Sequence, residues 1–207
     1  DRGLWFKMSF YEGSARVPLM IADVDMQPGL VKTPVSTIDV TATLGELAGA
    51  ALSDLSPWTE GQSLVPLGQG GERAEPVAME YAAEGSYAPL VALRDARYKY
   101  VRCTLDPEQL FDLDNDPHEL HNLADDPVHH DALNRLRGLA DERWDLALFD
   151  AQVRESQARR WVVYDALRNG QYYPWDFQPL QQASERYMRN HMDLNVLEDN
   201  QRYPRGE

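Results

Sequence analysis

The sequence predicts a small antiparallel β-sheet with packed helices and an extended C-terminal tail. Four short segments of strand-like composition follow one another between residues 76 and 113. From residue 127 onward, apolar residues instead recur every three or four positions, which is the period of an amphipathic helix. After residue 170 the chain becomes aromatic and rich in proline. The simplest arrangement of these parts is an antiparallel sheet with a helix on one face.

One strand and one helix are expected near the N-terminus. Arg16–Ala22 is a short apolar run whose proline stands near its start, a position that strands tolerate. Residues 35–49 carry apolar side chains at helical spacing, with Asp39 as the candidate N-cap and Gly49 as the terminator. Residues 50–75 are rich in glycine, proline and serine and are predicted to form a loop.

The central sheet is predicted from four strand candidates. The dipeptide Asp95-Ala96 separates the second candidate from the third and fits the turn of a hairpin. The candidates are Pro76–Ala82, Ala88–Arg94, Arg97–Cys103 and Leu110–Leu113.

The C-terminal part is predicted to be a helical segment followed by an aromatic tail. Apolar residues from Leu133 to Val153 keep helical spacing over about six turns, and 159–167 forms a further amphipathic segment. The tail core Tyr172–Leu180 must bury its rings, either across the body of the protein or on a neighbouring subunit. We expect a homo-oligomer held together by this tail, because aromatic side chains are enriched at interfaces.

Composition excludes several classes of protein. Lysine and arginine number 20 against 34 carboxylates, so the net charge is −14. This balance argues against nucleic-acid binding and against adhesion to anionic membranes, whereas it suits a cationic small-molecule substrate. The single cysteine, Cys103, excludes an internal disulfide and a cysteine-based zinc site. With no membrane-spanning run and no visible signal peptide, the sequence predicts a soluble, cytoplasmic protein, although residue 1 is not Met and we expect more chain upstream.

Several sequence patterns resemble metal-binding motifs but lack the residues or the spacing that these motifs require. Asp112–Asp116 resembles the start of a calcium loop, but Pro117 and Leu123 stand where such a loop needs glycine and glutamate. His118 and His121 are three residues apart instead of four. The pair His129-His130 also offers no common face, so all four histidines are interpreted as solvated loop residues.

The acidic stretch after Thr104, Cys103 and Lys7 each allow a structural interpretation beside a functional one. Between Thr104 and Asp131 there are nine carboxylates and no lysine or arginine, which indicates either a cation-attracting field or a solvated acidic loop. Cys103 is interpreted as half-buried packing at a strand end, because no activating partner is visible. Lys7 is a lone lysine beside aromatic residues, and by itself it fits a surface position.

Four ordered segments resemble the C-terminal part of the type I sulfatases, members of the alkaline-phosphatase superfamily. The motifs of that family are the segment after its catalytic Asp-His-Gly turn, the following helix, a G-x-S-L-x-P-L loop and a closing L-Y-D-L-x-x-D-P-x-E-x-x-N-L motif. The matching segments are Phe10–Leu19, Val35–Leu44, Gly61–Leu67 and Leu110–Ala124.

The choline-sulfatase branch of the family is similar over nearly the whole chain. Gly3–Ile21 resembles that branch, and so does Tyr164–Leu194, a tail that other sulfatases lack. The resemblance implies an α/β, alkaline-phosphatase-like fold for the whole enzyme. It also implies four parts for this chain: 1–50 as the end of the catalytic α/β domain, 51–126 as a C-terminal antiparallel-sheet subdomain, 127–170 as a helical segment and 171–207 as the tail.

The resemblance assigns catalysis largely to residues outside this chain. Sulfatases use a formylglycine made from the cysteine of a C-x-P-x-R motif and a divalent metal (Ca²⁺, Mn²⁺ or Mg²⁺). Cys103 does not stand in such a motif, and no metal ligand of the family matches a position here. Lys7 does match the lysine that contacts the sulfate oxygens, so it is the predicted catalytic residue. The chain alone is expected to be inactive.

The resemblance also implies a small-molecule sulfate ester, choline sulfate, as the substrate. A quaternary ammonium favours carboxylates and aromatic faces. Glu84 is the predicted substrate-binding carboxylate, with Trp175 and Asp193 of the tail as further candidates. The alternatives are a phosphate ester or aryl sulfate as substrate, or a non-enzymatic interaction module that binds through the tail.

Overall fold

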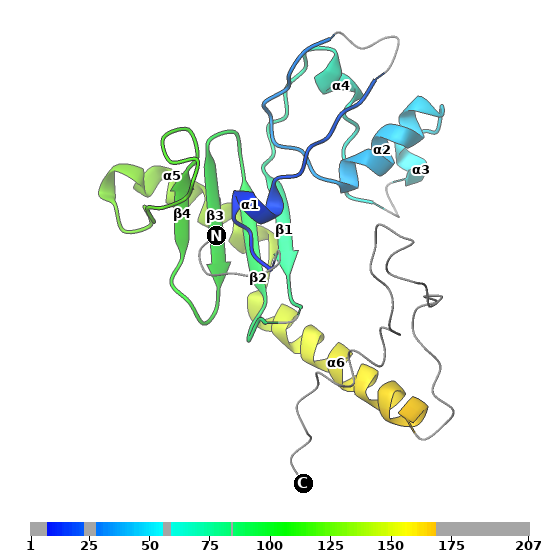
Figure 1. Cartoon of the computed structure of the whole chain (residues 1–207), viewed down its shortest axis with the longest axis vertical. Coiled ribbons are helices and arrows are strands. Elements are labelled where there is room, and N and C mark those ends of the chain that lie inside the picture. The colour runs from blue at the N-terminus through cyan, green and yellow to red at the C-terminus, as the bar shows by residue number, and fades with distance from the viewer. Residues whose placement is uncertain (1–7, 23–27, 56–58, 84, 169–207) are drawn as a thin grey trace, which may run out of the picture. The chain divides into compact units, whose positions relative to one another are not determined.

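The structure is a computed structural model that describes residues 8–22, 28–55, 59–83 and 85–168 (Figure 1). The chain divides into two compact units, Asp1–Glu155 and Ser156–Glu207. In chain order its elements are α1 (Glu12–Ala15), α2 (Ile38–Leu47), α3 (Leu52–Leu55), α4 (Val65–Gly68), β1 (Val77–Tyr81), β2 (Leu90–Arg94), β3 (Tyr98–Cys103), β4 (Gln109–Asp112), the 3₁₀ turn η1 (Pro127–His129), α5 (His130–Arg143) and α6 (Leu146–Arg168).

The predicted antiparallel sheet is confirmed. Its four strands lie in the order β1-β2-β3-β4, and each is antiparallel to its neighbour. The hairpin between β2 and β3 is one residue longer than expected, because Arg97 belongs to the turn. The Asp95 carboxylate accepts hydrogen bonds from the backbone N–H groups of Arg97 and Tyr98, at 2.8 and 2.6 Å, and thereby fixes this turn.

One face of the sheet packs against α5. Side chains alternate along a strand, so cross-strand partners share a face. Tyr100 of β3 is paired with both Leu93 and Leu110, and all three are buried against the leucines of the helix. The buried members of this core are Leu93, Tyr100, Leu110, Leu133, Leu136 and Ala140.

The opposite face is covered by the segment that leads into α1. Lys99 and its cross-strand partner Phe111 point to this side. The Tyr11 ring meets Phe111 edge-on at a centroid distance of 6.0 Å, and the Lys99 ammonium donates to the Phe10 carbonyl at 2.7 Å. In Figure 1, α1 accordingly lies over the strands on the side away from α5. The sequence predicted a cover on one face only.

Helix α2 begins and ends close to the predicted positions, but its N-cap was assigned wrongly. Thr37 is the N-cap residue, and Asp39 lies inside the first turn with no exposed surface. Asp39 is drawn inward because its carboxylate accepts a hydrogen bond from the Ser36 N–H at 2.7 Å and binds groups further along the chain. Gly49 follows the helix at φ +83°, as expected for a terminating glycine.

Two other predictions about secondary structure are wrong. Arg16–Ala22 is not a strand, because none of the described residues pairs with it. The helix expected from Leu133 to Val153 is interrupted after Arg143. Trp144 is extended, and Asp145 restarts the chain as α6 by accepting a hydrogen bond from the Leu148 N–H at 2.9 Å.

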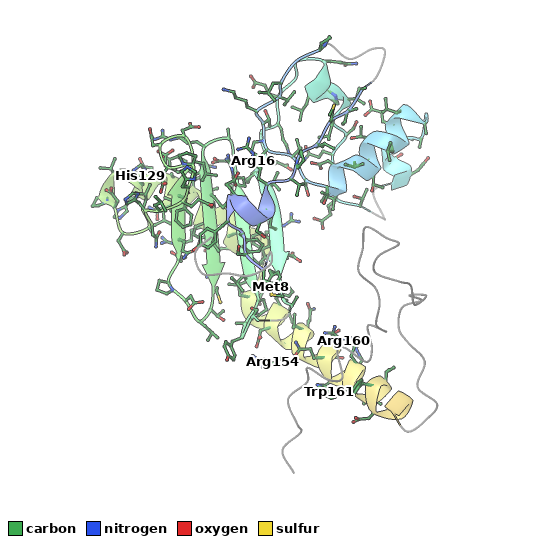
Figure 2. All side chains as sticks on the ribbon, viewed as in Figure 1. Met8, Arg16, His129, Arg154, Arg160 and Trp161 are labelled. Carbon is green, nitrogen blue, oxygen red and sulfur yellow. The ribbon has the colours of Figure 1, made fainter. Side chains whose placement is uncertain are left out.

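The second unit is described only over residues 156–168, which form the C-terminal part of α6. Trp161, which is labelled in Figure 2, lies there. Its ring meets that of Tyr164 edge-on, at a centroid distance of 5.4 Å. The aromatic tail predicted for 171–207 lies outside the described residues. Among the helices that the structure describes, none is both long and apolar enough to cross a membrane.

Candidate functional site

The predicted site residues Lys7, Glu84, Trp175 and Asp193 all lie outside the described residues. The immediate neighbours of the first two are described, and these neighbours lie together. A Cβ placed on Gly85 would be 3.8 Å from the sulfur of Met8. Met8 is labelled in Figure 2, at the start of the segment that crosses the sheet toward α1. The Met8 sulfur therefore lies near the position that a side chain at residue 85 would occupy.

A cavity of about 410 Å³ lies beside Met8. Residues 8–11 form one wall, and the other walls come from the strands and from the loop before β4. Cys103 lines the cavity and is half-buried at the end of β3, as the sequence predicted. Glu119 and Asn122 of the closing motif also line it. The cavity thus connects the segment after Lys7 with that motif.

A buried lysine that the sequence analysis missed fixes this segment to the sheet. Lys99 stands on β3 with only 1% of its side chain exposed. Its ammonium lies 2.7 Å from the Phe10 carbonyl, 2.6 Å from Glu12 Oε1 and 2.8 Å from Glu119 Oε1. The second oxygen of Glu119 accepts the Glu12 N–H at 2.7 Å. We call Lys99, Glu12 and Glu119 the ionic anchor.

The ionic anchor is balanced in charge and held in an unusual backbone conformation. Arg94, on the adjacent strand, has its Nε 3.9 Å from Glu12 Oε1, so two cations face two carboxylates. Glu119 has a φ of 54°, which is rare for a residue with a side chain. Its N–H donates to the Asp116 carbonyl at 3.0 Å, and the tight turn that results aims the carboxylate at Lys99.

Asp112 and Asn122 of the closing motif both have structural partners. Asp112 accepts from Arg97 Nε at 3.0 Å and Nη2 at 2.5 Å, and this guanidinium holds the pKa of the Asp112 carboxyl well below its usual range. Asn122 accepts from the Leu110 N–H at 2.9 Å and donates to the Glu108 carbonyl at 3.0 Å. The motif therefore ties its own turn to β4 and to the loop before it.

Three carboxylates of the acidic stretch between Thr104 and Asp131, Glu108, Asp112 and Glu119, pair with lysine or arginine side chains from outside it. Glu108 receives hydrogen bonds from Arg137 Nη2 at 2.6 Å and from the Tyr100 hydroxyl at 2.5 Å. The bond from Arg137 lowers the pKa of Glu108, while burial and this carboxylate raise the pKa of Tyr100. Together with the pairs at Asp112 and Glu119, these contacts leave less of a cation-attracting field than the sequence alone indicates.

The G-x-S-L-x-P-L loop is built on α2. The Asp39 carboxylate accepts from the Gln62 N–H at 2.8 Å and from Arg73 Nη1 at 2.5 Å. A Cβ on Gly61 would lie 2.2 Å from the Ile38 carbonyl oxygen, so only glycine fits. The Thr43 hydroxyl accepts the Leu64 N–H at 2.9 Å and closes the loop. These contacts explain the glycine of the motif by packing alone.

The histidines have local roles. His129 Nδ1 lies 3.2 Å from the Tyr98 hydroxyl, and His121 Nδ1 lies 3.4 Å from an Asp116 oxygen. Across the part of the chain that the structure describes, no group of three or more His, Cys, Asp or Glu side chains could hold a metal ion. These described residues therefore do not fit the divalent metal that the family resemblance implies.

Comparisons with known proteins identify the class. The model described as "N-sulphoglucosamine sulphohydrolase, C-terminal" matches residues 1–145, and the model described as "Choline sulfatase enzyme C terminal" matches residues 151–203. The choline-sulfatase of Rhizobium meliloti is 65% identical over 210 residues, which cover 100% of this chain and 41% of that protein. Arylsulfatase K of Xenopus laevis is 33% identical over 58% of this chain and 24% of its own length.

A solved structure supports the same class. The phosphonate monoester hydrolase from Silicibacter pomeroyi superposes with a TM-score of 0.54 and 28% identity, over 67% of this chain and 31% of its own. The likeness agrees with the predicted alkaline-phosphatase-like fold class, of which this chain supplies the small antiparallel sheet and its helices.

The chain belongs to the sulfatase family, of which it forms a C-terminal portion. Its likeness to a choline-sulfatase extends over every part of the chain, including the region after α5. The chain spans 41% of the length of that choline-sulfatase, 24% of arylsulfatase K and 31% of the phosphonate monoester hydrolase.

Proposed function

We propose that this chain is the C-terminal part of an enzyme that hydrolyses choline sulfate to choline and sulfate. The sulfatase class and the likeness to a choline-sulfatase along the whole chain support this substrate. The observation that carries the proposal is the 65% identity to a choline-sulfatase over the whole chain. The Met8 sulfur also lies near the position that a side chain at Gly85 would occupy, which supports placing Lys7 and Glu84, the residues before these two, in one site.

Lys7 is the proposed catalytic residue. An ammonium beside the sulfuryl oxygens stabilises negative charge as the ester bond breaks, and it does so more strongly where water is excluded. The segment Phe10–Glu12, which follows Lys7 in the chain, is held against the sheet by the ionic anchor.

Glu84 is the proposed binding group for the trimethylammonium end of the substrate. A carboxylate attracts this cation by charge, and aromatic faces add a cation–π contribution. Trp175 and Asp193 are proposed as further substrate contacts from the tail. Both lie within residues 151–203, which match the choline sulfatase C-terminal model.

The nucleophile and the metal are proposed to come from upstream residues. In the family, a formylglycine supplies the attacking oxygen and a divalent cation polarises the sulfate. Cys103 does not stand in a C-x-P-x-R motif, so it is not proposed as the precursor of that formylglycine. It lines a cavity instead. This chain alone is accordingly proposed to be inactive.

The tail is also proposed to form subunit contacts in a homo-oligomer. Trp161 and Val162 of α6, just before the tail, are 59% and 70% exposed, and apolar surface of this kind favours association. The cytoplasmic location expected from the sequence stays a prediction.

A second candidate function is the hydrolysis of an aryl sulfate or a phosphate ester. The likeness to a phosphonate monoester hydrolase and to arylsulfatase K supports it. This alternative keeps the role of Lys7 but removes the need for Glu84.

The test is a comparison of substrates in the full-length protein. Wild type and Glu84→Gln are assayed with choline sulfate and with an aryl sulfate of similar size, and the exposed Glu142→Gln serves as the matched control. We expect Glu84→Gln to raise KM for choline sulfate by about tenfold or more, the value of one lost charge contact, and to leave the aryl sulfate unchanged. An equal effect on both substrates, or a wild-type preference for the aryl sulfate, would overturn the choline assignment.

A further inference from the structure

We propose that residues 16–22 form a β-strand of a sheet whose other strands come from the upstream part of the same enzyme. No described residue of this chain pairs with the segment, and its large apolar side chains are exposed. The inference rests on the upstream part that the proposed function assigns to the enzyme, and it is independent of the substrate and of Lys7.

The composition of the segment is that of a strand buried on both faces. Six consecutive residues, 17–22, carry no polar side chain. A half-buried strand alternates apolar and polar residues, whereas a parallel strand of an α/β protein is apolar throughout, because helices cover both faces of its sheet. Pro18 stands near the start of the run, where strands tolerate the loss of one N–H donor. The run therefore fits the α/β class of the whole enzyme.

The surroundings of the segment in this chain do not match that composition. Val17, Leu19 and Met20 are 53%, 46% and 92% exposed. Leu30 and Val31, further along the chain, are 85% and 50% exposed. Single exposed apolar residues are common on protein surfaces, but their concentration in one stretch of chain indicates a surface that another polypeptide covers.

The backbone of the segment also lacks the protection that a free strand edge needs. Arg16, labelled in Figure 2, leaves α1 in an extended conformation with φ −83° and ψ 107°. Proteins protect exposed edges with charged side chains or bulges, because an unpaired edge invites association. Residues 17–22 carry no charge. A neighbouring strand would both cover this edge and bind its N–H and C=O groups.

The ionic anchor fixes the point from which the segment starts. Lys99 and Glu119 hold Glu12, the first residue of α1. The Glu12 carbonyl in turn accepts the Arg16 N–H at 3.0 Å, across the single turn of this helix. The chain therefore leaves the small sheet from a fixed position, which reduces the conformational freedom that the segment loses when it pairs.

The length of a related enzyme indicates the partner. This chain covers 41% of the choline-sulfatase to which it is 65% identical. The rest of such an enzyme belongs to the same polypeptide, so its effective concentration at the segment is high. A second copy of this chain, paired edge to edge, is the other possible occupant, and the experiment separates the two.

The experiment compares two substitutions in the full-length protein. Met20→Asp introduces a charge into the segment. Its matched control, Val128→Asp, introduces one at the turn η1, where the side chain is 82% exposed. Both side chains are similarly exposed in this chain, so exposure alone predicts two small effects. Thermal midpoints are measured for both variants, and hydrogen exchange of the wild type is measured by mass spectrometry on peptides that cover residues 16–22.

The expected result is a large effect at the segment only. Met20→Asp should lower the thermal midpoint by about 5 °C or more, because the pairing would bury an unpaired carboxylate. Val128→Asp should shift the midpoint by less than about 1 °C. The amides of residues 17 and 19–22 should exchange at least about a hundredfold more slowly than in an unstructured chain. The exchange measurement needs no variant, so it remains decisive if Met20→Asp does not fold.

Three results would overturn the inference. The first is a midpoint for Met20→Asp equal to that for Val128→Asp. The second is exchange of the segment within about tenfold of the unstructured rate. The third is protection that disappears when the wild type is diluted, because a second copy would then be the partner. If all results are as expected and the enzyme does not hydrolyse choline sulfate, the proposed function fails and this inference stands.

Discussion

Asp39 and Lys99 are both buried charged side chains that hold a loop, but they differ in what they hold. Asp39 collects backbone N–H groups and Arg73 from within 34 positions along the chain, and it builds the loop that begins at Gly61. Lys99 collects two carboxylates and a carbonyl, and it attaches a segment from the start of the chain to the sheet. The chemistry of the two anchors is similar, so their effects on stability should be similar.

The difference lies in what stands beside each anchor. Asp39 is surrounded by its own loop and by helix α2. The ionic anchor instead holds Phe10, which stands three residues after the predicted catalytic lysine. Family motifs that look equally characteristic in the sequence can thus hold different parts of the chain in place. Substitutions at the two anchors, made in the full-length protein, should show how much each contributes to stability and how much to turnover.

The largest expected effect on stability is that of Gly61→Ala. Its Cβ would lie 2.2 Å from the Ile38 carbonyl oxygen, and neither atom belongs to a side chain that can rotate away. We expect a loss of about 4 kcal/mol in the free energy of unfolding, measured by urea denaturation. Gly138→Ala, in the middle of α5 with open space around its Cβ, is the control and should gain about 0.5 kcal/mol. Equal effects at the two positions would contradict the account of the loop.

Asp39→Asn should have the next largest effect. The substitution leaves the Arg73 guanidinium, which is 10% exposed, beside a neutral amide, and breaking a buried pair costs about 3 kcal/mol. The kcat of the folded protein should change less than threefold. Asp54→Asn, at an exposed position of α3, controls for the loss of a carboxylate. A large fall in kcat for Asp39→Asn would remove the distinction between the two anchors.

A smaller effect is expected from pH, through Asp112. The Arg97 guanidinium and the Asn115 amide lower the pKa of this carboxyl in the folded state. A group whose folded pKa is lowered contributes stability above its unfolded pKa of about 3.9, and this contribution is lost as the pH falls further. Asp112→Asn should therefore show a weaker loss of stability between about pH 4 and pH 2 than wild type, measured by urea midpoints. Parallel pH profiles would show that Asp112 is not held by Arg97.

The antiparallel sheet could be predicted from the sequence because the signals were local. Four short segments of strand-like composition and the turn at Asp95 indicate the strands and one of their pairings. The interruption between α5 and α6 was missed, although Asp145 carries the usual N-cap signal, because the leucine spacing continues across it. The strand expected at Arg16–Ala22 would need a neighbouring strand to pair with, and local composition does not show whether such a strand exists.

The anchors could not be predicted because their partners are distant in the sequence. Lys99 stands between two tyrosines in a strand, and a lysine at that position requires a buried anion. The pattern does not say whether Glu12, Glu119 or another carboxylate supplies it. Lys7 and Glu84, in turn, are predicted from family resemblance alone, and both lie outside the described residues.

The most direct test of the account is the turnover of choline sulfate by Lys7→Ala in the full-length protein. The matched control is Lys32→Ala, which removes an ammonium at an exposed position before α2. If the Lys7 ammonium stabilises charge on the sulfate, kcat should fall at least about a hundredfold for Lys7→Ala and stay within twofold for Lys32→Ala. A Lys7→Ala protein that keeps a third or more of the wild-type kcat would contradict the assignment of Lys7 as a catalytic residue.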